Sequence, residues 1–204
     1  MDTTYITPAR NRIDEQALAQ LFLDARTQNG WLEEEVPEEL LRDAVEITKW
    51  GPTSANQSPL RIVFVRSAEA KAKLLEGVAP GNVEKTKQAP VTAILAYDEK
   101  FYDLLPKLFP HADAKSWFSG NADFARENAR RNATLQAAYF ILALRAVGLD
   151  AGPMTGFDAA KVDAAFFPEG NVKSDILVNI GHGDPSKVFP RLPRLDFDEM
   201  AKFA

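Results

Sequence analysis

Hydrophobic residues recur at helical spacing along much of the chain. Asp14 can cap a first helix, and Pro37 suits the first turn of a second one. The apolar face of that second helix comprises Leu40, Leu41, Ala44, Val45 and Thr48. The spacing predicts helices at residues 14–25, 37–48, 69–79, 122–147 and 159–167, with a short amphipathic stretch at 197–203.

Three shorter apolar runs predict strands at residues 61–66, 91–97 and 175–181. The first two runs are almost continuously apolar, which indicates a sheet that is covered on both faces. Residues 101–120 contain prolines and aromatic residues without a clear period and predict a loop with a little helix. Since no repeat or linker interrupts the chain, we expect one α+β domain over residues 1–204.

The longest helical pattern changes character along its length. Its first half is charged, whereas residues 133–144 are apolar on nearly every face, and Gly148 closes the helix. This apolar part is too short to cross a membrane. We therefore expect it in a core or a large interface, and we expect Leu142 and Leu144 to support a homodimer.

Composition narrows the classes of function. The chain has 204 residues, no cysteine and a net charge of −5, so it offers no disulfide, no thiolate metal ligand and no basic footprint for nucleic acid. The two histidines, His111 and His182, lack metal-ligand spacing, and we expect no metal. The first residues do not resemble a signal peptide, and no membrane span is expected. These features favour a cytoplasmic enzyme or binding protein.

The loop at residues 50–61 carries the strongest chemical signal. It places Thr53, Ser54 and Asn56 between Pro52 and Pro59, directly before an apolar strand. Each proline fixes its own φ and pushes the preceding residue toward extended geometry. A stiff loop rich in hydrogen-bonding groups can hold a planar polar ligand at a small ordering cost. Taken alone, the same composition also fits a capping and turn segment.

The loop resembles the Pro-Ser-Ser-x-Asn-x-Gln-Pro signature of the FMN-dependent nitroreductase superfamily. Further matches follow in the family's order at residues 25–29, 81–85 and 152–158, and in a basic tail at Arg191 and Arg194. The resemblance runs from about Leu18 to Phe203 and is closest to reductases assigned to malonic semialdehyde in bacterial uracil catabolism. It implies a three-layer α+β fold with a small, mainly antiparallel sheet flanked by helices. It also implies an intertwined homodimer, an N-terminal extension at residues 1–13 and a C-terminal arm at 184–204.

The resemblance implies an FMN-dependent oxidoreductase that uses NADH or NADPH and works by ping-pong hydride transfer through flavin N5. The expected reaction is the reduction of malonic semialdehyde to 3-hydroxypropionate. One alternative is a broad-specificity nitroaromatic or quinone reductase. Another is a flavin-binding or flavin-remodelling protein that does not oxidise NAD(P)H. No glycine-rich dinucleotide motif is present, so the nicotinamide would bind over the flavin.

The resemblance assigns the flavin to residues in five segments. They are Arg26, Thr27, Asn29, Pro52, Thr53, Ser54, Asn56, Asn82, Lys85, Pro153, Met154, Thr155, Gly156, Arg191 and Arg194. Arg191 and Arg194 would hold the phosphate, with Lys187 as a weaker candidate, because guanidinium groups bind phosphate oxygens in pairs. For Arg26, the alternative is a surface ion pair with Asp24 or Glu33.

Two positions depart from the family pattern. Asn29 is neutral where a basic residue is common, so Lys85 is expected to support the negative charge of the reduced flavin. Thr155 stands where many members have glutamate, which makes the N5 side less acidic. No residue is assigned as a catalytic acid or base, since the flavin carries the chemistry. A substrate pocket is expected at His111, Trp117 and Phe118.

Overall fold

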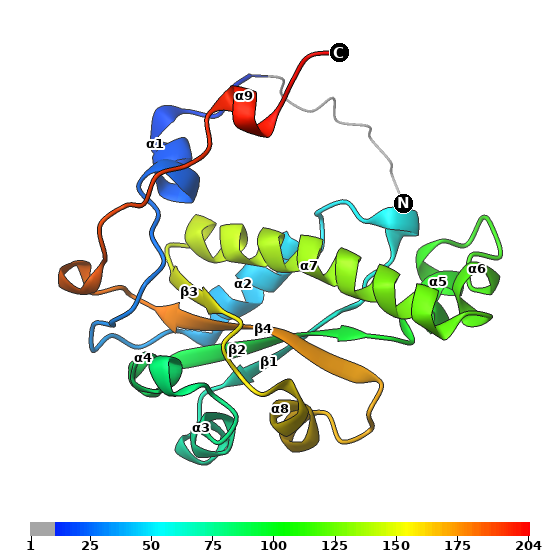
Figure 1. Ribbon diagram of the computed structural model, residues 1–204, viewed down its shortest axis with the longest axis horizontal. Coiled ribbons are helices and arrows are strands. Elements are labelled where there is room, and N and C mark those ends of the chain that lie inside the picture. Colours follow the sequence, from blue (N-terminus) through cyan, green and yellow to red (C-terminus); the bar gives the residue numbers. More distant parts are fainter. Residues whose placement is uncertain (1–10) are drawn as a thin grey trace.

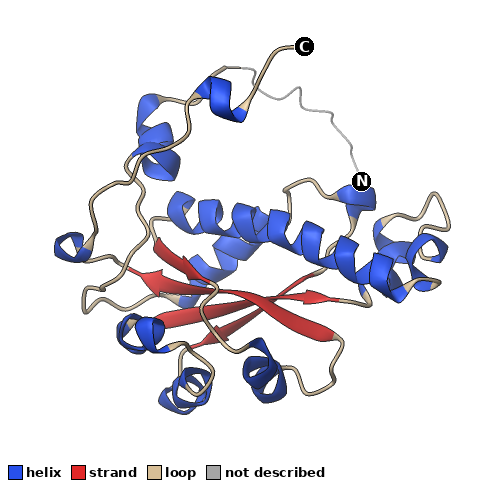
Figure 2. Ribbon diagram, viewed as in Figure 1, coloured by secondary structure: helices blue, strands red, loops and turns tan. Residues whose placement is uncertain are grey.

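The computed structural model describes residues 11–204 and has three layers (Figure 1). The middle layer is a four-stranded antiparallel sheet in the order β1-β2-β4-β3. Its strands are β1 (Leu60–Val65), β2 (Val91–Asp98), β3 (Asp150–Met154) and β4 (Val172–Gly181). Figure 2 shows helices on both faces of this sheet. On one side lie α2 (Glu38–Thr48) and α7 (Ala122–Ala146); on the other lie α3 (Ala68–Leu75), α4 (Val83–Gln88) and α8 (Ala159–Phe166).

Alternate residues of the central strand β2 enter two separate hydrophobic cores. Ala93 and Leu95 pack toward α2 and α7, whereas Ile94 and Ala96 pack toward α3 and α8. Because neighbouring side chains of a strand point to opposite faces, both faces must be apolar when both are covered. The prediction of a sheet covered on both sides is confirmed.

The two helices above the sheet begin and end close to the predicted residues. Pro37 directly precedes α2, whose buried residues Leu41, Ala44 and Thr48 lie on the predicted apolar face. The Asn121 side chain accepts a hydrogen bond from the backbone N–H of Phe124 and so caps α7. Just beyond the other end, Gly148 has a φ of 84°, a conformation that glycine adopts without a steric penalty.

The sequence prediction was wrong about two elements and inaccurate about others. No strand was predicted at residues 150–154, but they form β3, where Pro153 is tolerated because β3 is an edge strand. The helix α4 was not predicted at all. The predicted helix at 14–25 divides into α1 (Glu15–Leu18) and the π-helical segment η1 (Ala19–Leu23). The helix predicted at 69–79 ends at Leu75, and β4 starts three residues before its predicted beginning.

A smaller third core lies at the N-terminal end of α7. It gathers the buried side chains of Phe101, Leu105, Phe118 and Ala129 around short helices. These helices are η4 (Phe101–Leu104), α5 (Leu105–Leu108) and α6 (Ser116–Ser119). They match the prediction of a loop with a little helix at residues 101–120.

Both ends of the described chain form an arm that stands off from the body (Figure 1). The arm contains α1 and η1 from one end, and η5 (Pro185–Lys187) and α9 (Phe197–Met200) from the other. Its exposed apolar side chains include Phe189, Leu192, Leu195, Phe197, Met200 and Phe203. Most of the expected N-terminal extension at 1–13 lies outside the described residues. Over residues 11–204, no helix has the length and apolar character that a membrane crossing needs.

Candidate functional site

A cavity of about 470 Å³ opens where the arm joins the body. We call it the arginine cavity; it is lined by Phe22, Ala25, Arg26, Thr27, Asn29, Arg145, Phe189, Pro190, Arg191, Leu192 and Arg194. Four of these residues are arginines and none is acidic. In a chain with a net charge of −5, this local excess of positive charge favours an anionic ligand.

The arginines of the cavity also fasten the two ends of the chain together. The Arg26 guanidinium donates to the carbonyl of Phe189, and the Arg191 guanidinium donates to the carbonyl of Leu23. Arg194 donates to carbonyls of its own segment at 3.0 Å. Among the ion pairs formed by residues 11–204, none involves an arginine of the cavity, so the alternative pairing of Arg26 with Asp24 or Glu33 is not found. Carbonyl contacts orient the guanidinium groups without neutralising them.

Arg145 is a cavity residue that the sequence prediction missed. It lies in the last turn of α7, and its Nη1 donates to the carbonyl of Leu21 at 2.8 Å. Burial lowers the pKa of Arg145, and the nearby Asp150 carboxylate opposes that shift. An arginine remains charged in either case. The available signal was a single charged residue within the apolar run Ile141-Leu142-Ala143-Leu144-Arg145-Ala146-Val147.

The segment that follows Arg26 runs alongside strand β3. The backbone N–H of Gln28 donates to the carbonyl of Ala151 at 3.1 Å. A Cβ at Gly152 would come within 2.6 Å of the Gln28 carbonyl oxygen, so only glycine permits this approach. The Trp31 indole N–H then donates to the carbonyl of Lys85 at 3.1 Å. These contacts bring the first and third predicted flavin segments to the same edge of the sheet.

The far end of β3 meets the start of α4. The Asn82 side-chain amide donates to the carbonyl of Gly156 at 3.0 Å, and a Cβ at Gly156 would lie only 2.5 Å from that amide nitrogen. Thr155, between β3 and this contact, is exposed. Within the described chain, the Lys85 ammonium forms no hydrogen bond or ion pair, and its side chain is half-buried. We call the segments at 26–29, 82–85 and 153–156 together the β3 side.

The polar loop after α2 is held by side chains of α7. The backbone N–H of Ser54 donates to Asn132 Oδ1 at 2.9 Å, and the Tyr139 hydroxyl donates to the carbonyl of Pro52 at 3.0 Å. Ala55 and Asn56 both have positive φ values, 50° and 49°. Two successive non-glycine residues in the left-handed region are uncommon and concentrate at functional segments.

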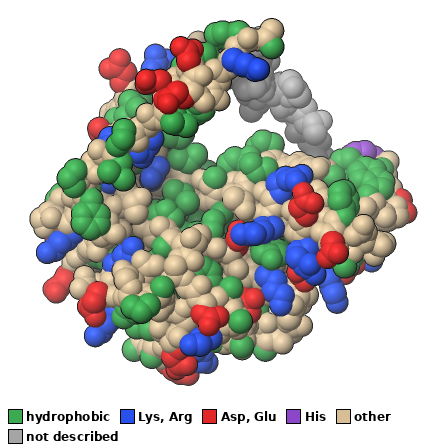
Figure 3. Space-filling model, viewed as in Figure 1, with side chains coloured by type: hydrophobic (Ala, Val, Ile, Leu, Met, Phe, Trp, Pro, Cys, Tyr) green, Lys and Arg blue, Asp and Glu red, His purple; other side chains and the backbone are tan. Residues whose placement is uncertain are grey.

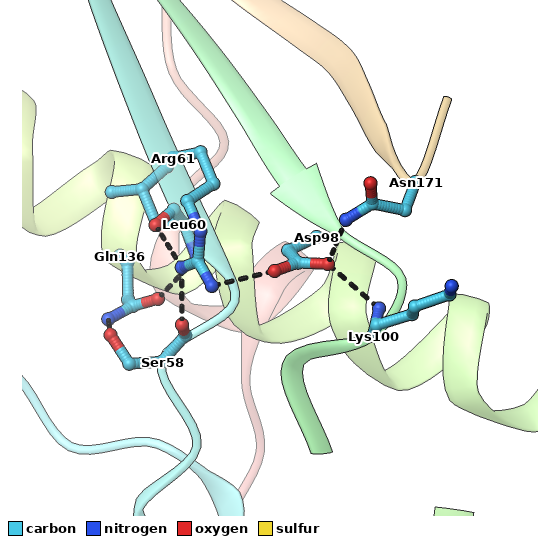
Figure 4. Close-up of polar contacts among 7 residues, drawn as sticks. All are labelled: Ser58, Leu60, Arg61, Asp98, Lys100, Gln136 and Asn171. Atoms are coloured by element: carbon cyan, nitrogen blue, oxygen red, sulfur yellow. Dashed lines mark hydrogen bonds and ion pairs between the residues drawn. The ribbon is translucent and has the colours of Figure 1, made fainter. Parts of the chain in front are cut away.

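The exit of this loop is tied to the sheet by a polar network that Figure 4 shows. The Arg61 guanidinium donates to the carbonyls of Ser58 and Leu60 at 2.9 Å and to Asp98 Oδ2 at 2.7 Å. Gln136 Oε1 on α7 accepts from the backbone N–H of Leu60 at 3.1 Å. The loop is therefore fixed at both ends, and its strained backbone is stabilised by its surroundings.

The loop and the arginine cavity lie far apart within one chain. The loop contacts α7 at Asn132, and the cavity contacts α7 at Arg145. Thirteen residues of α-helix separate these contacts by about 20 Å along the axis. The structure thus gathers Arg26, Thr27, Asn29, Arg191 and Arg194 around one cavity, and places Pro52, Thr53, Ser54 and Asn56 elsewhere.

The three predicted pocket residues differ in exposure. His111 is exposed, and its ring lies 3.8 Å from that of Phe109 between centroids; Trp117 is 51% exposed and packs edge-on against Phe109. Phe118 is only 4% exposed and belongs to the third core. The Asn56 side chain donates to the carbonyl of Leu108 at 2.7 Å, which joins this aromatic group to the polar loop.

Lys187 does not line the arginine cavity; its aliphatic stem packs over Gly30. Over residues 11–204, no three histidine or acidic side chains lie close enough together to hold a metal ion.

Comparison with known proteins supplies the family. The model of the nitroreductase family matches residues 26–181. The chain is 57% identical over 192 residues to a protein of Stenotrophomonas maltophilia named as an NADH dehydrogenase/NAD(P)H nitroreductase, covering 94% of this chain and 98% of that one. A protein of Polynucleobacter asymbioticus with the same name is 58% identical over 190 residues, covering 93% and 97%.

Solved structures agree on the fold. A protein of Bacillus subtilis described as a nitroreductase superposes with a TM-score of 0.82 at 20% identity, covering 94% of this chain and all of that one. A protein of Exiguobacterium sibiricum, described as a nitroreductase in complex with FMN, superposes with a TM-score of 0.81 at 18% identity, covering 97% of this chain and all of that one.

Proposed function

The chain belongs to the nitroreductase family, and on that premise we propose that it is an FMN-dependent NAD(P)H oxidoreductase that reduces nitroaromatic and quinone acceptors. The names of its relatives support this broad activity more than a dedicated aldehyde reduction. The FMN seen in a structural neighbour supports the cofactor.

The observation that carries the proposal is the arginine cavity. A phosphate monoester carries about two negative charges at neutral pH and offers three acceptor oxygens. Four guanidinium groups without a carboxylate among the lining residues fit such a group in charge and in donor number. Arg191 and Arg194 would hold the phosphate, while Arg26 and Arg145 add positive charge from the opposite walls.

The β3 side would receive the ring. The bound flavin would supply the N5 atom that accepts and delivers hydride. Asn82 would face the polar edge of the ring, and the Lys85 ammonium, which has no partner within the described chain, would favour negative charge there. Thr155 and Gly156 would present backbone along the ring, since β3 and the Asn82 contact hold this segment in place.

The polar loop would complete the site from a second copy of the chain. The loop contacts α7 about 20 Å along the helix axis from the point where α7 lines the arginine cavity, and none of Pro52, Thr53, Ser54 and Asn56 lines that cavity. A homodimer in which α7 helices face each other would bring one copy's loop to the other copy's cavity. Figure 3 shows hydrophobic side chains over α7 below the arm, on the face that such a partner would cover. The exposed aromatic pair His111 and Trp117 would then lie near the acceptor.

The test begins with the absorption spectrum of the purified protein and continues with NAD(P)H oxidation. We expect a yellow protein that oxidises NADH or NADPH when a quinone or a nitroaromatic compound is present. A protein that binds FMN but oxidises neither nucleotide with any acceptor would instead be a flavin-binding or flavin-remodelling protein. Failure to bind FMN would overturn the proposal.

A second candidate substrate is malonic semialdehyde, reduced to 3-hydroxypropionate. The exposed and neutral Thr155 supports it, because the site then lacks a carboxylate that would repel an anionic carbonyl compound. Steady-state kcat/KM values for malonic semialdehyde, a quinone and a nitroaromatic compound, measured with one preparation, decide between the two. A value for the semialdehyde well above the others would make it the preferred substrate.

A further inference from the structure

The short helix α4, which carries part of the β3 side, is held by a side chain of the neighbouring helix α3. The Lys71 side chain on α3 is half-buried, and its ammonium donates to the carbonyls of Thr86, at 3.2 Å, and Ala89. Both carbonyls belong to the C-terminal end of α4. The last carbonyls of a helix have no partner within it, so Lys71 satisfies two of them and places a positive charge at the negative end of the helix dipole.

The same helix is also held by a series of hydrogen-bonded polar side chains that are fully buried. Thr86, Thr92 and Asn179 are each 0% exposed. Thr92 Oγ1 donates to Asn179 Oδ1 at 2.8 Å, and the Asn179 amide donates to Thr86 Oγ1 at 3.3 Å. The Thr86 hydroxyl in turn points to the Met154 sulfur at 3.7 Å. This series links the two central strands to α4 and to the end of β3.

The segments joined in this way are those that would meet the flavin ring. Asn82 precedes α4, and Lys85 lies within it next to Thr86; Met154 precedes Thr155 and Gly156. A helix of six residues is too short to be stable alone, so its position must come from such contacts. Burying polar groups is costly, and fully satisfied buried networks make a structure rigid.

We propose that Lys71 and Thr86 are positioning residues for the ring-binding segments: by holding the C-terminal half of α4, they fix the place of Lys85 within the helix and of Asn82, which contacts Gly156. The inference rests on the proposed function only in the identity of the ligand. Burial lowers the pKa of Lys71 to about 8 with no charged group as a further cause, which agrees with a lysine that is held by carbonyls alone. Neither side chain lines the arginine cavity, so both act through the segments that they hold.

The first experiment needs no flavin. In the FMN-free protein, hydrogen–deuterium exchange at the amides of residues 83–89 should be roughly tenfold or more faster in Lys71→Met than in wild type, because α4 loses its cap. Lys73→Met is the matched control. Lys73 is exposed on α3, the helix that also carries Lys71, and its substitution should leave exchange in α4 unchanged. Lys71→Gln keeps a donor and should restore most of the protection. Equal exchange in Lys71→Met and Lys73→Met would overturn the inference.

The second experiment uses FMN and separates positioning from general stability. In Lys71→Met and in Thr86→Val, which keeps the side-chain volume, the FMN midpoint potential should become more negative, because Lys85 is no longer held toward the reduced ring. Reduction by NAD(P)H should slow roughly tenfold to a hundredfold, while FMN affinity, set by the arginine cavity, changes little. Midpoint potentials equal to that of Lys73→Met would overturn the role. If wild type binds no FMN, the proposed function fails, and the exchange experiment still tests the support of α4.

Discussion

The arginine cavity and the polar loop stand at different points of α7 and are built in different ways. The cavity is assembled from both ends of the described chain and the end of α7, and within residues 11–204 its arginines donate to carbonyls and form no ion pair, so their charge remains available. The loop is a single segment, and Asn132 and Tyr139 of α7 hold its backbone in place. One region is prepared for an anion, and the other offers a rigid edge of small polar groups. About 20 Å of helix lies between them.

This difference shows that motifs which follow one another in sequence need not meet in one chain. The flavin residues expected from the sequence divide into a group around the cavity and β3 and a group in the loop. If both groups serve one flavin, the active unit is a dimer, because each chain then carries half of two sites. Substitutions can disable the cavity or the loop separately, and we expect the two kinds of substitution to have different effects.

The largest effects are expected on α7, where two neighbouring leucines separate folding from assembly. Leu144 is 0% exposed and belongs to the core, so the sequence-based expectation that it supports the dimer was wrong. Leu144→Asp should unfold the chain, at a cost above about 4 kcal/mol, because a charge is buried without a partner. Circular dichroism and thermal melting would detect the loss.

Leu142 and Leu135 lie seven residues apart on one face of α7, and Leu135 is 43% exposed. Leu142→Asp should leave the chain folded, dissociate the dimer and abolish FMN binding together. Light scattering and flavin absorbance measure the two outcomes. A Leu142→Asp protein that is still dimeric and fully loaded with FMN would show that this face of α7 is not the interface.

The second effect concerns the cavity alone. A hydrogen bond to a charged group contributes about 1.5–3 kcal/mol, so Arg191→Ala should weaken FMN binding roughly tenfold to a hundredfold. Riboflavin, which lacks the phosphate, should bind the wild type and the variant equally. Arg42→Ala is the control, because Arg42 is exposed on α2 and pairs with Glu38 one turn away. Unchanged FMN affinity in both Arg191→Ala and Arg194→Ala would exclude the phosphate clamp.

A smaller effect is expected in the loop. Ala55 has a φ of 50°, which costs an L-residue about 1–2 kcal/mol, whereas glycine avoids that cost but loses more chain entropy on folding. Ala55→Gly should therefore stabilise the protein by about 0.5–1 kcal/mol in urea unfolding. Gly148→Ala, at a φ of 84°, is the inverse control and should destabilise it. A destabilised Ala55→Gly would mean that the Ala55 methyl group contributes packing that outweighs the strain.

The smallest effect is expected on the way in which the free energy of unfolding changes with pH. The pKa of Lys71 is lowered to about 8 because burial penalises the ammonium, so between pH 8 and 10.5 the unfolded chain binds more protons at this residue than the folded chain. Stability rises with pH wherever the unfolded state binds more protons. The free energy of unfolding should therefore gain a positive contribution from Lys71 between about pH 8 and 10.5, in addition to other titrations. Lys71→Met should lose that contribution, and Lys73→Met should keep it.

Local patterns predicted the larger elements well. Asp14 accepts from the backbone N–H of Ala17 as a cap should, and Pro37 and Gly148 mark helix ends as expected. Strand β3 was not predicted because Gly152 and Pro153 are typical of a turn. They form a strand because they lie at the edge of the sheet, next to β4. Leu142 and Leu144 look alike in sequence, yet Leu142 is only partly buried and Leu144 belongs to the main core. Arg145 could not be assigned to a site because its neighbours in the cavity come from the N-terminal segment, more than a hundred residues away, and from the tail.

The bonds between Arg26 and Phe189, and between Arg191 and Leu23, have a consequence for the order of events during synthesis. These contacts close a loop of more than 160 residues, and the entropic cost of such closure is met only when both ends are present. The ribosome makes Arg26 early and Arg191 near the end of the described chain. While the sheet and its two cores assemble, the anion site therefore does not yet exist. If the arginine cavity holds the FMN phosphate as proposed, the cofactor can be captured only after Arg191 has been made, so FMN loading would report that both ends of the described chain are in place.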